Sequence, residues 1–178
     1  MSDIRFQHFP ITHEPPQFVL DVVECFRKNE SAISTVQGMS GSSDVVLGFI
    51  RTDLKAIGFD VEKSKKSSDK IFRPVTFGIN GKPQLKYEID AYNSETRVGL
   101  EIEAGRGVMG NAIYRDLILG MMMTNVDHLV IAVANEYKYK SKNKQIVSKD
   151  FEKCVAICNA LSGHTRVQLP YTITIVGY

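Results

Sequence analysis

Carboxylates and glycines follow one another closely in residues 100–110, LEIEAGRGVMG. Glu101 and Glu103 form an E-x-E pair at strand-like spacing, and paired carboxylates of this kind can bind a divalent cation. A G-x-G-x-x-G pattern follows at Gly105, Gly107 and Gly110. In dinucleotide-binding proteins this pattern lets a strand-to-helix turn approach a pyrophosphate. The two patterns predict different chemistries, and the surrounding elements have to decide between them.

Alternating apolar and polar runs, separated by turn signals, surround these residues. The runs 71–79 and 84–92 flank Asn80-Gly81, which is the strongest short signal for a β-hairpin. The turn NSET at 93–96 then leads to a third run, 97–104. These runs predict a three-stranded antiparallel meander that carries the E-x-E pair on its third strand.

Helices and buried strands complete the predicted fold. Helical spacing and caps predict four helices, at 17–29, 44–58, 111–123 and 148–162. The bounded apolar run 128–135 is typical of an interior strand, and residues 171–178 form a final strand. We expect residues 1–16 to be irregular, residues 59–62 to be a short extended piece and residues 138–144 to be a basic loop. The order predicts an α/β (α+β) fold with a mixed sheet flanked by helices.

The composition is that of one ordinary globular domain over residues 1–178, with 43% hydrophobic and 24% charged residues. The net charge of +2 indicates no particular partner. Polar residues interrupt the most apolar stretch, 117–134, so no membrane span is expected. Three cysteines are too few for a disulfide framework and favour a reducing, cytoplasmic setting. We interpret Cys154 and Cys158 as small buried hydrophobes, and His128 as a structural histidine.

The faces of the strands place further carboxylates beside the E-x-E pair. If the first and last residues of the NSET turn lie opposite each other, Asp90 lies opposite Gly99. Asp90 and Glu101 are then diagonal neighbours about 7–8 Å apart on one face. Like charges this close are unfavourable without a cation, and Gly99 would leave open space for an ion or a phosphate. The pattern therefore predicts a Mg²⁺ site.

Two other interpretations stay open. The acidic face could be the solvated side of an amphipathic hairpin, on which Lys86 pairs with Glu103. Alternatively, the glycines could bind a dinucleotide in an oxidoreductase, with Glu136 as the acid that contacts the ribose. An antiparallel strand with two carboxylates near the pyrophosphate argues against the dinucleotide, and a tight strand-to-helix turn explains the glycines better.

Asp90, Glu101 and Glu103, together with the order of the elements, resemble the PD-(D/E)XK nuclease superfamily. The family has an αβββαβ core with an acid on the second strand and E-x-K on the third. Glu103 stands in place of the lysine, which is similar to the E-x-E variant of some type II restriction endonucleases. The resemblance covers about residues 44–135, and Ile89 stands where the family has proline before the first acid.

The resemblance implies a Mg²⁺-dependent DNA endonuclease, of the restriction or defence type, that acts as a homodimer on double-stranded DNA. Asp90 and Glu101 would hold Mg²⁺, or Mn²⁺ in its place, and the metal would lower the pKa of a bound water. Glu103 or a metal-bound water would accept the proton. Glu62 and Asp69 are candidates for a further upstream acid.

Basic residues could bind the nucleic-acid backbone. They lie in two predicted loops: Lys63, Lys65, Lys66 and Lys70 in the first, and Lys138, Lys140, Lys142 and Lys144 in the second. Arg106 could contact the scissile phosphate or be a solvated turn residue. Arg115 and Asp116 could pair with solvent or with the site, and we favour solvent. Charge runs are, however, often only solvated loops. A catalytically silent DNA-binding module of the same fold is an alternative function.

Overall fold

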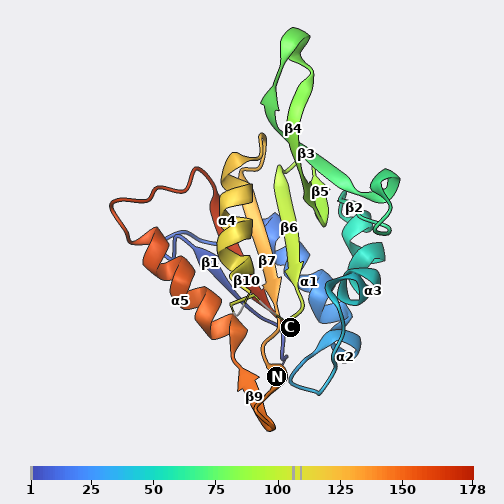
Figure 1. Cartoon of the computed structure of the whole chain (residues 1–178), viewed down its shortest axis with the longest axis vertical. Helices are drawn as coiled ribbons and strands as arrows, with labels where there is room; N and C mark the ends of the chain where they lie inside the picture. Colours follow the sequence, from blue (N-terminus) through green and yellow to red (C-terminus); the bar gives the residue numbers. More distant parts are fainter. Residues whose placement is uncertain (1, 106, 109) are drawn as a thin grey trace.

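A six-stranded mixed sheet forms the centre of the protein (Figure 1). The computed structural model describes residues 2–105, 107–108 and 110–178. The sheet has the order β1-β10-β7-β6-β5-β2, with β10, β7 and β6 mutually parallel and the other strands antiparallel to their neighbours. The strands are β1 (Arg5–Phe9), β2 (Asp60–Val61), β5 (Ala91–Asn93), β6 (Val98–Glu103), β7 (His128–Val133) and β10 (Thr172–Gly177).

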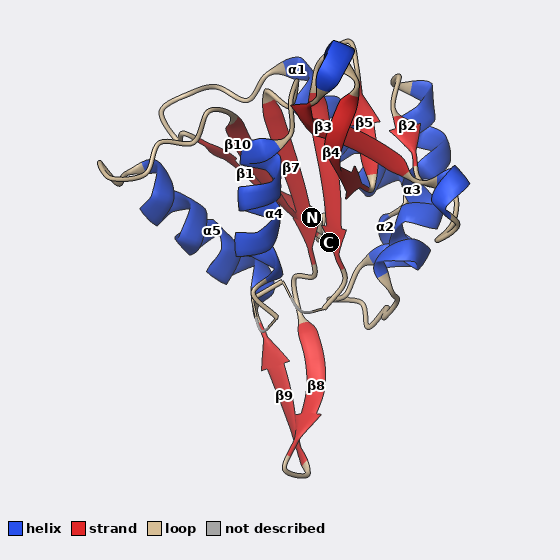
Figure 2. Cartoon of the chain, turned by 45° about the horizontal axis from the view of Figure 1, so that its top comes forward, coloured by secondary structure: helices blue, strands red, loops and turns tan. Residues whose placement is uncertain are grey.

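Helices cover both faces of this sheet (Figure 2). One face carries α1 (Gln17–Lys28), α2 (Glu30–Ile33) and α3 (Ser43–Ala56), and the other carries α4 (Ala112–Met122) and α5 (Asp150–Ser162). Strand β7 contributes side chains to both cores, because Val130 and Ala132 face the first and Leu129, Ile131 and Val133 face the second. Burial on both faces explains its continuous apolar run and confirms the predicted interior strand.

The predicted helices are confirmed, with ends that differ by at most two residues. The predicted class, a mixed sheet flanked by helices, is also confirmed. From α3 to β7 the core elements follow in the order α3, β2, β5, β6, α4, β7, which is αβββαβ. The three antiparallel strands are therefore β2, β5 and β6, and α4 connects β6 to its parallel neighbour β7.

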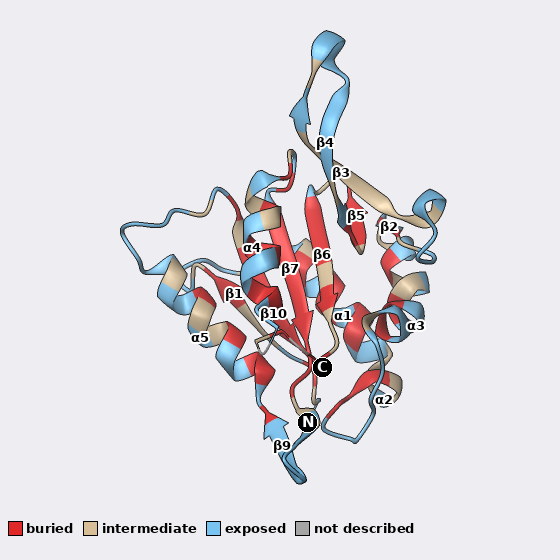
Figure 3. Ribbon diagram, in the orientation of Figure 1, coloured by how far each residue is buried: buried red, intermediate tan, exposed pale blue. Residues whose placement is uncertain are grey.

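The first strand of the meander was predicted wrongly. Residues 71–89 form a separate hairpin of β3 (Ile71–Phe77) and β4 (Pro83–Ile89), which projects from the body (Figures 1 and 3). Asn80 and Gly81 form its turn with φ of 59° and 69°, as the Asn-Gly signal predicts. The chain bends at Asp90 and divides the predicted second strand into β4 and β5. The short extended piece expected at 59–62 contains β2, which pairs with β5 and takes the place of the first meander strand.

Two further segments differ from the prediction. Strand β1 pairs with β10, although residues 1–16 were expected to be irregular. Strands β8 (Tyr137–Ser141) and β9 (Lys144–Ser148) form a projecting hairpin in place of the predicted basic loop (Figure 2). Short 3-10 helices lie at Ser67–Asp69 and Ile79–Gly81. In the described part of the chain, no helix has the length and apolar character needed to cross a membrane.

Candidate active site

Glu62, Asp90 and Glu101 lie in a row across three neighbouring strands. Ala91 pairs with Leu100, so the next step along both strands brings Asp90 beside Glu101. On the other side, the Glu62 backbone N–H donates to the Asp90 carbonyl oxygen at 2.9 Å and continues the β2–β5 pairing. Residues at the same level of neighbouring strands share a face. All three carboxylates therefore belong to the face that α4 covers.

The register differs from the predicted one but keeps the acids on one face. Tyr92, rather than Asp90, lies opposite Gly99. Because the shift is two residues, the alternation of side chains is preserved, and Asp90 becomes a direct neighbour of Glu101 instead of a diagonal one. The predicted open space at Gly99 is wrong, since a Cβ there would lie 2.5 Å from Ile89 Cδ1.

The bend at Asp90 fixes one of its carboxylate oxygens. Strand β5 begins only at Ala91, so Ile102 on β6, which pairs with β7 on one side, has no partner on β5 at this level. The Ile102 N–H donates instead to Asp90 Oδ2 at 2.8 Å. Buried backbone N–H groups require such a partner. The hydrogen bond orients the carboxylate and leaves Oδ1 available to a ligand.

A cleft of about 410 Å³ opens over the acids. Its walls are the β3–β4 hairpin, through Phe72 and Lys86, and helix α4. The Lys86 ammonium lies 4.2 Å above the Phe72 ring centre. Glu103 is paired with Arg115 instead of with Lys86, which contradicts the cross-strand pair considered from the sequence.

Helix α4 adds two charged residues that the sequence did not assign to the site. Asp116 is only 1% exposed, and the Arg115 guanidinium Nη2 lies 2.7 Å from its Oδ1. Arg115 therefore bridges Glu103 and Asp116 at the edge of the cleft. The expectation that this pair faces solvent is wrong for Asp116. Its position between the core residues Ile113 and Leu117 is the signal that could have identified it as buried.

The acids raise one another's pKa. Burial is the main cause for Asp90, whose pKa rises to about 7, and the charges of Glu62 and Glu103 add to it. Burial, Asp90 and Asp116 together raise the pKa of Glu101 well above its ordinary value. Arg115 opposes this shift but does not cancel it.

Burial also raises the pKa of Asp116 to about 7 and raises that of Glu62. Asp116 Oδ2 is buried and has no hydrogen-bond partner among the described residues. The cluster is thus short of positive charge at neutral pH.

This donor set fits a magnesium ion. Mg²⁺ usually keeps several waters and binds through one or two carboxylates together with substrate phosphates. Asp90 and Glu101 are two such carboxylates, and the orphaned Asp116 oxygen could accept a hydrogen bond from a metal-bound water. Among the residues that the structure describes, no three His, Cys, Asp or Glu side chains form a complete metal cage. Such a cage is what Zn²⁺ requires and Mg²⁺ does not.

The predicted basic residues lie at two ends of the molecule. Lys63, Lys65 and Lys66 are exposed in the segment that follows Glu62, and Lys65 Nζ lies 3.0 Å from Asp44. Lys70 pairs with Glu88. The other four lysines belong to the β8–β9 hairpin, which projects from the opposite end of the sheet (Figure 1): Lys138, Lys140, Lys142 and Lys144.

None of these eight lysines lines the acid cleft, but the first group follows Glu62 along the chain. The lysines of the β8–β9 hairpin belong to the opposite end of the sheet, and Lys138 Nζ lies 3.3 Å from Glu136. Asp69 accepts a hydrogen bond from Ser64 Oγ and lines a different pocket, so Glu62 is the upstream acid that the fold brings to the cleft. Arg106 lies outside the described residues.

The glycine-rich turn is filled by protein. Strands β6 and β7 with α4 do form a parallel βαβ unit, as a dinucleotide site requires. However, the Tyr137 ring lies against Gly105, where φ is 140°. The Asp150 carboxylate lies 3.7 Å from the position of a Cβ at Gly107. A ring and a carboxylate at these positions disfavour a pyrophosphate, so the glycines fit a packed turn better.

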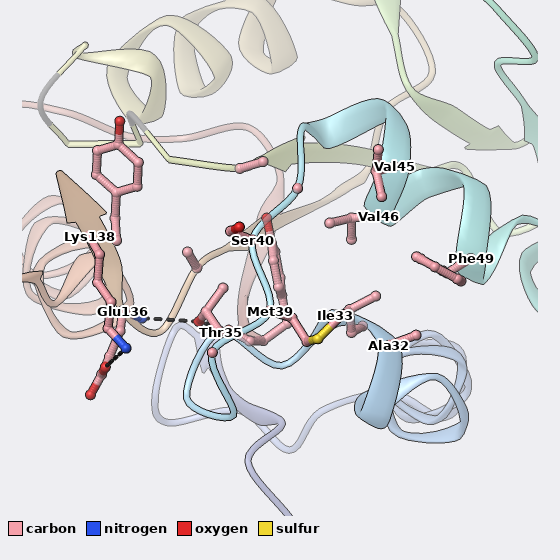
Figure 4. Close-up of a pocket in the computed structure, with 16 residues that line it drawn as sticks. Ala32, Ile33, Thr35, Met39, Ser40, Val45, Val46, Phe49, Glu136 and Lys138 are labelled. Atoms are coloured by element: carbon pink, nitrogen blue, oxygen red, sulfur yellow. Dashed lines mark hydrogen bonds and ion pairs between the residues drawn. The ribbon is translucent and has the colours of Figure 1, made fainter.

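A second cavity, of about 550 Å³, lies on the opposite face of the sheet (Figure 4). Its walls are mainly apolar and include Ile33, Val46 and Phe49. Its charged side chains, Glu136 and Lys138, form an ion pair at 3.3 Å. Although this cavity is larger, the acid cleft holds the side chains with perturbed pKa values, which are typical of functional sites.

Comparison with known proteins adds no assignment. A scan against models of known protein families finds no match, and a search of curated proteins finds no similar sequence. The function must therefore be argued from the acid cleft.

Proposed function

We propose that this protein is a Mg²⁺-dependent endonuclease of the PD-(D/E)XK type that acts on double-stranded DNA. The row of Glu62, Asp90 and Glu101 carries the proposal, because it sets three carboxylates at one level of the antiparallel strands. The αβββαβ order of the core supports the same family. The excess of acid over base in the cleft supports a cation as the missing partner.

Four charged residues at the cleft and its edge have roles in the proposed phosphodiester hydrolysis. Asp90 and Glu101 would hold Mg²⁺, which when bound lowers the pKa of a water and neutralises charge on the phosphate. Glu103 is fixed by Arg115 and is the candidate acceptor for the proton of the attacking water. The half-exposed Arg115 guanidinium can donate to the scissile phosphate.

The exposed lysines beside the cleft supply attraction for the DNA backbone. Lys63 and Lys66 follow directly after Glu62 and face solvent. The more distant lysines of the β8–β9 hairpin can contact a duplex only where it extends past the opposite end of the sheet. A homodimer would provide one cleft for each strand of the duplex.

Cleavage of plasmid DNA by wild type and Glu101→Gln tests the proposal. We expect nicking or linearisation with Mg²⁺ and none with a chelator. Glu101→Gln should reduce cleavage by more than the roughly 100-fold typical of residues outside the metal's own ligands. Glu95→Gln, at an exposed position, is the matched control and should cleave like wild type.

Melting curves of each variant show whether it is folded. A folded Glu101→Gln variant that cleaves like wild type would overturn the catalytic assignment. DNA binding without cleavage by the wild type would indicate a catalytically silent DNA-binding module.

A further inference from the structure

The β3–β4 hairpin projects beyond the body of the protein at the acid cleft (Figure 1). Its strands pair only with each other and form no part of the six-stranded sheet. Phe72 and Lys86, near its base, line the cleft, whereas its outer half is exposed (Figure 3). A two-stranded ribbon is marginally stable by itself in water. The exposed part of this ribbon is therefore suited to contact with a partner.

Apolar side chains are concentrated in the outer half of the hairpin. Ile79, at the turn, is 88% exposed, and Phe77 and Leu85 beside it are 53% and 42% exposed. Single exposed apolar side chains are common, but grouped ones mark an interaction surface. This group lies outside both hydrophobic cores.

The outer part of the hairpin, beyond Glu88 at its base, carries charge of one sign. Residues 71–87 contain Arg73, Lys82 and Lys86 and no acid. Arg73 is used internally, because its guanidinium lies 3.8 Å above the Tyr92 ring centre and donates to the Thr124 carbonyl. Lys82 and Lys86 are exposed. An apolar tip between lysines is complementary to a polyanion with an accessible groove.

We infer that the β3–β4 hairpin enters the major groove of the duplex DNA whose backbone occupies the acid cleft. The inference rests on the proposed nuclease function, since it extends the substrate contact of the same site. The major groove of B-DNA is about 12 Å wide and accommodates a two-stranded β-ribbon. Ile79 and Phe77 would contact base edges such as thymine methyl groups, and Lys82 would contact phosphate.

A second copy of this chain is a weaker candidate for the partner. In a two-fold contact the same patch meets itself. Such a contact would bring the Lys82 side chains of the two copies together. No acid lies in residues 71–87 to compensate their charge. Repulsion between like charges opposes that contact and favours the anionic groove.

Duplex binding by tip variants tests the inference. Fluorescence anisotropy in the presence of a chelator measures binding to a labelled duplex without cleavage. The double substitution Phe77→Ser, Ile79→Ser should weaken binding by about 10-fold, because it removes apolar contacts to base edges. Ile11→Ser, at another exposed isoleucine with 62% exposure, is the matched control and should bind like wild type. Both should melt like wild type, because the substituted side chains are exposed.

A groove-specific probe separates the hairpin from general electrostatic binding. Methylation of guanine N7, which lies in the major groove, should interfere with binding by wild type and less with binding by the double variant. Equal affinity and equal interference for the two proteins would overturn the inference. So would a double variant that changes only from dimer to monomer.

The two proposals can fail separately. Weaker binding by the tip variant without Mg²⁺-dependent cleavage by wild type would support the hairpin contact and overturn the nuclease. Cleavage by wild type with unchanged binding by the variant would do the opposite. A wild type that binds no duplex would overturn both.

Discussion

Two clusters of buried ionisable side chains lie in the same sheet and are built in opposite ways. In the first, the rings of His8 and His128 stack with their centres 5.5 Å apart. Thr174 Oγ1 lies 3.1 Å from His8 Nδ1 and 3.0 Å from His128 Nε2. Burial lowers the pKa of His128 to about 3, so the ring is neutral. Its polar atoms are matched, and it carries no charge that needs a partner.

The second cluster, the row of Glu62, Asp90 and Glu101, is built in the opposite way. Asp90 raises the pKa of its neighbour Glu101, and the charges of Glu62 and Glu103 raise the pKa of Asp90. Asp116 keeps a buried oxygen that has no partner in the described residues. Buried polar groups that are satisfied stabilise a fold, whereas an uncompensated charge cluster lowers stability and persists where function needs it. The comparison confirms His128 as structural and supports the acid cleft as the functional site.

The largest expected effect is a difference in the free energy of unfolding between variants of the two clusters. His128→Ala should lower the free energy of unfolding by about 3 kcal/mol, because it leaves a cavity and removes the partner of Thr174. Glu101→Gln should leave this free energy unchanged or raise it, since it removes a repelling charge. Urea denaturation near neutral pH measures both, and His13→Ala, at an exposed position, is the control. Equal losses in the two variants would contradict the distinction.

The next effect is a pair of opposed pH dependences below neutral pH. The folded His128 has a pKa of about 3, below its ordinary 6.5, so its contribution is full above 6.5 and is lost as the pH falls toward 3. Asp90 has the opposite shift, from 3.8 to about 7, so its contribution is full below 3.8 and is lost as the pH rises toward 7. At about 1.4 kcal/mol for each unit of pKa shift, the two contributions largely cancel, and the stability of the wild type should vary little over this range.

Variants and magnesium separate the two contributions. Between about pH 3 and 7, Asp90→Asn should leave a stability that rises with pH, and His128→Asn should leave a stability that falls with pH. Mg²⁺ should stabilise the wild type more at alkaline than at acidic pH, because it binds the ionised carboxylates. Urea denaturation across the pH range, with and without Mg²⁺, measures this. A Mg²⁺ effect that does not depend on pH would argue against ionised Asp90 and Glu101 as its ligands.

The smallest effect concerns Arg115, a cation that partly compensates the acids. Arg115→Met should slow cleavage by about 10- to 100-fold, as expected for loss of a residue that orients the site. It should also lower the Mg²⁺ concentration required, because a competing positive charge is gone. Arg97→Met is the matched control, since Arg97 pairs with Asp127 at 2.8 Å on the surface. Cleavage and Mg²⁺ dependence like those of wild type would remove Arg115 from the mechanism.

The sequence predicted those parts of the fold that have a local signal. Helical periodicity located four helices, and the Asn80-Gly81 signal located the β3–β4 turn. It did not reveal that this hairpin leaves the sheet, because its alternation resembles that of a meander strand. An extended piece was expected at 59–62, but its pairing with β5 as strand β2 has no local signal. Strand β1 also lacks a local signal and forms by pairing with the edge of β10.

For the site, the sequence by itself determined that Asp90 and Glu101 share a face. Alternation of side chains has a period of two, so this relation survived the two-residue error in register. Only the tertiary structure brought Glu62 and Asp116 to the same cleft. Their neighbours there come from other elements of the chain, and the bend at Asp90 that makes room for the cleft depends on packing. Periodicity determines the direction of side chains within one element. The distances between side chains of different elements are set only when those elements pack together.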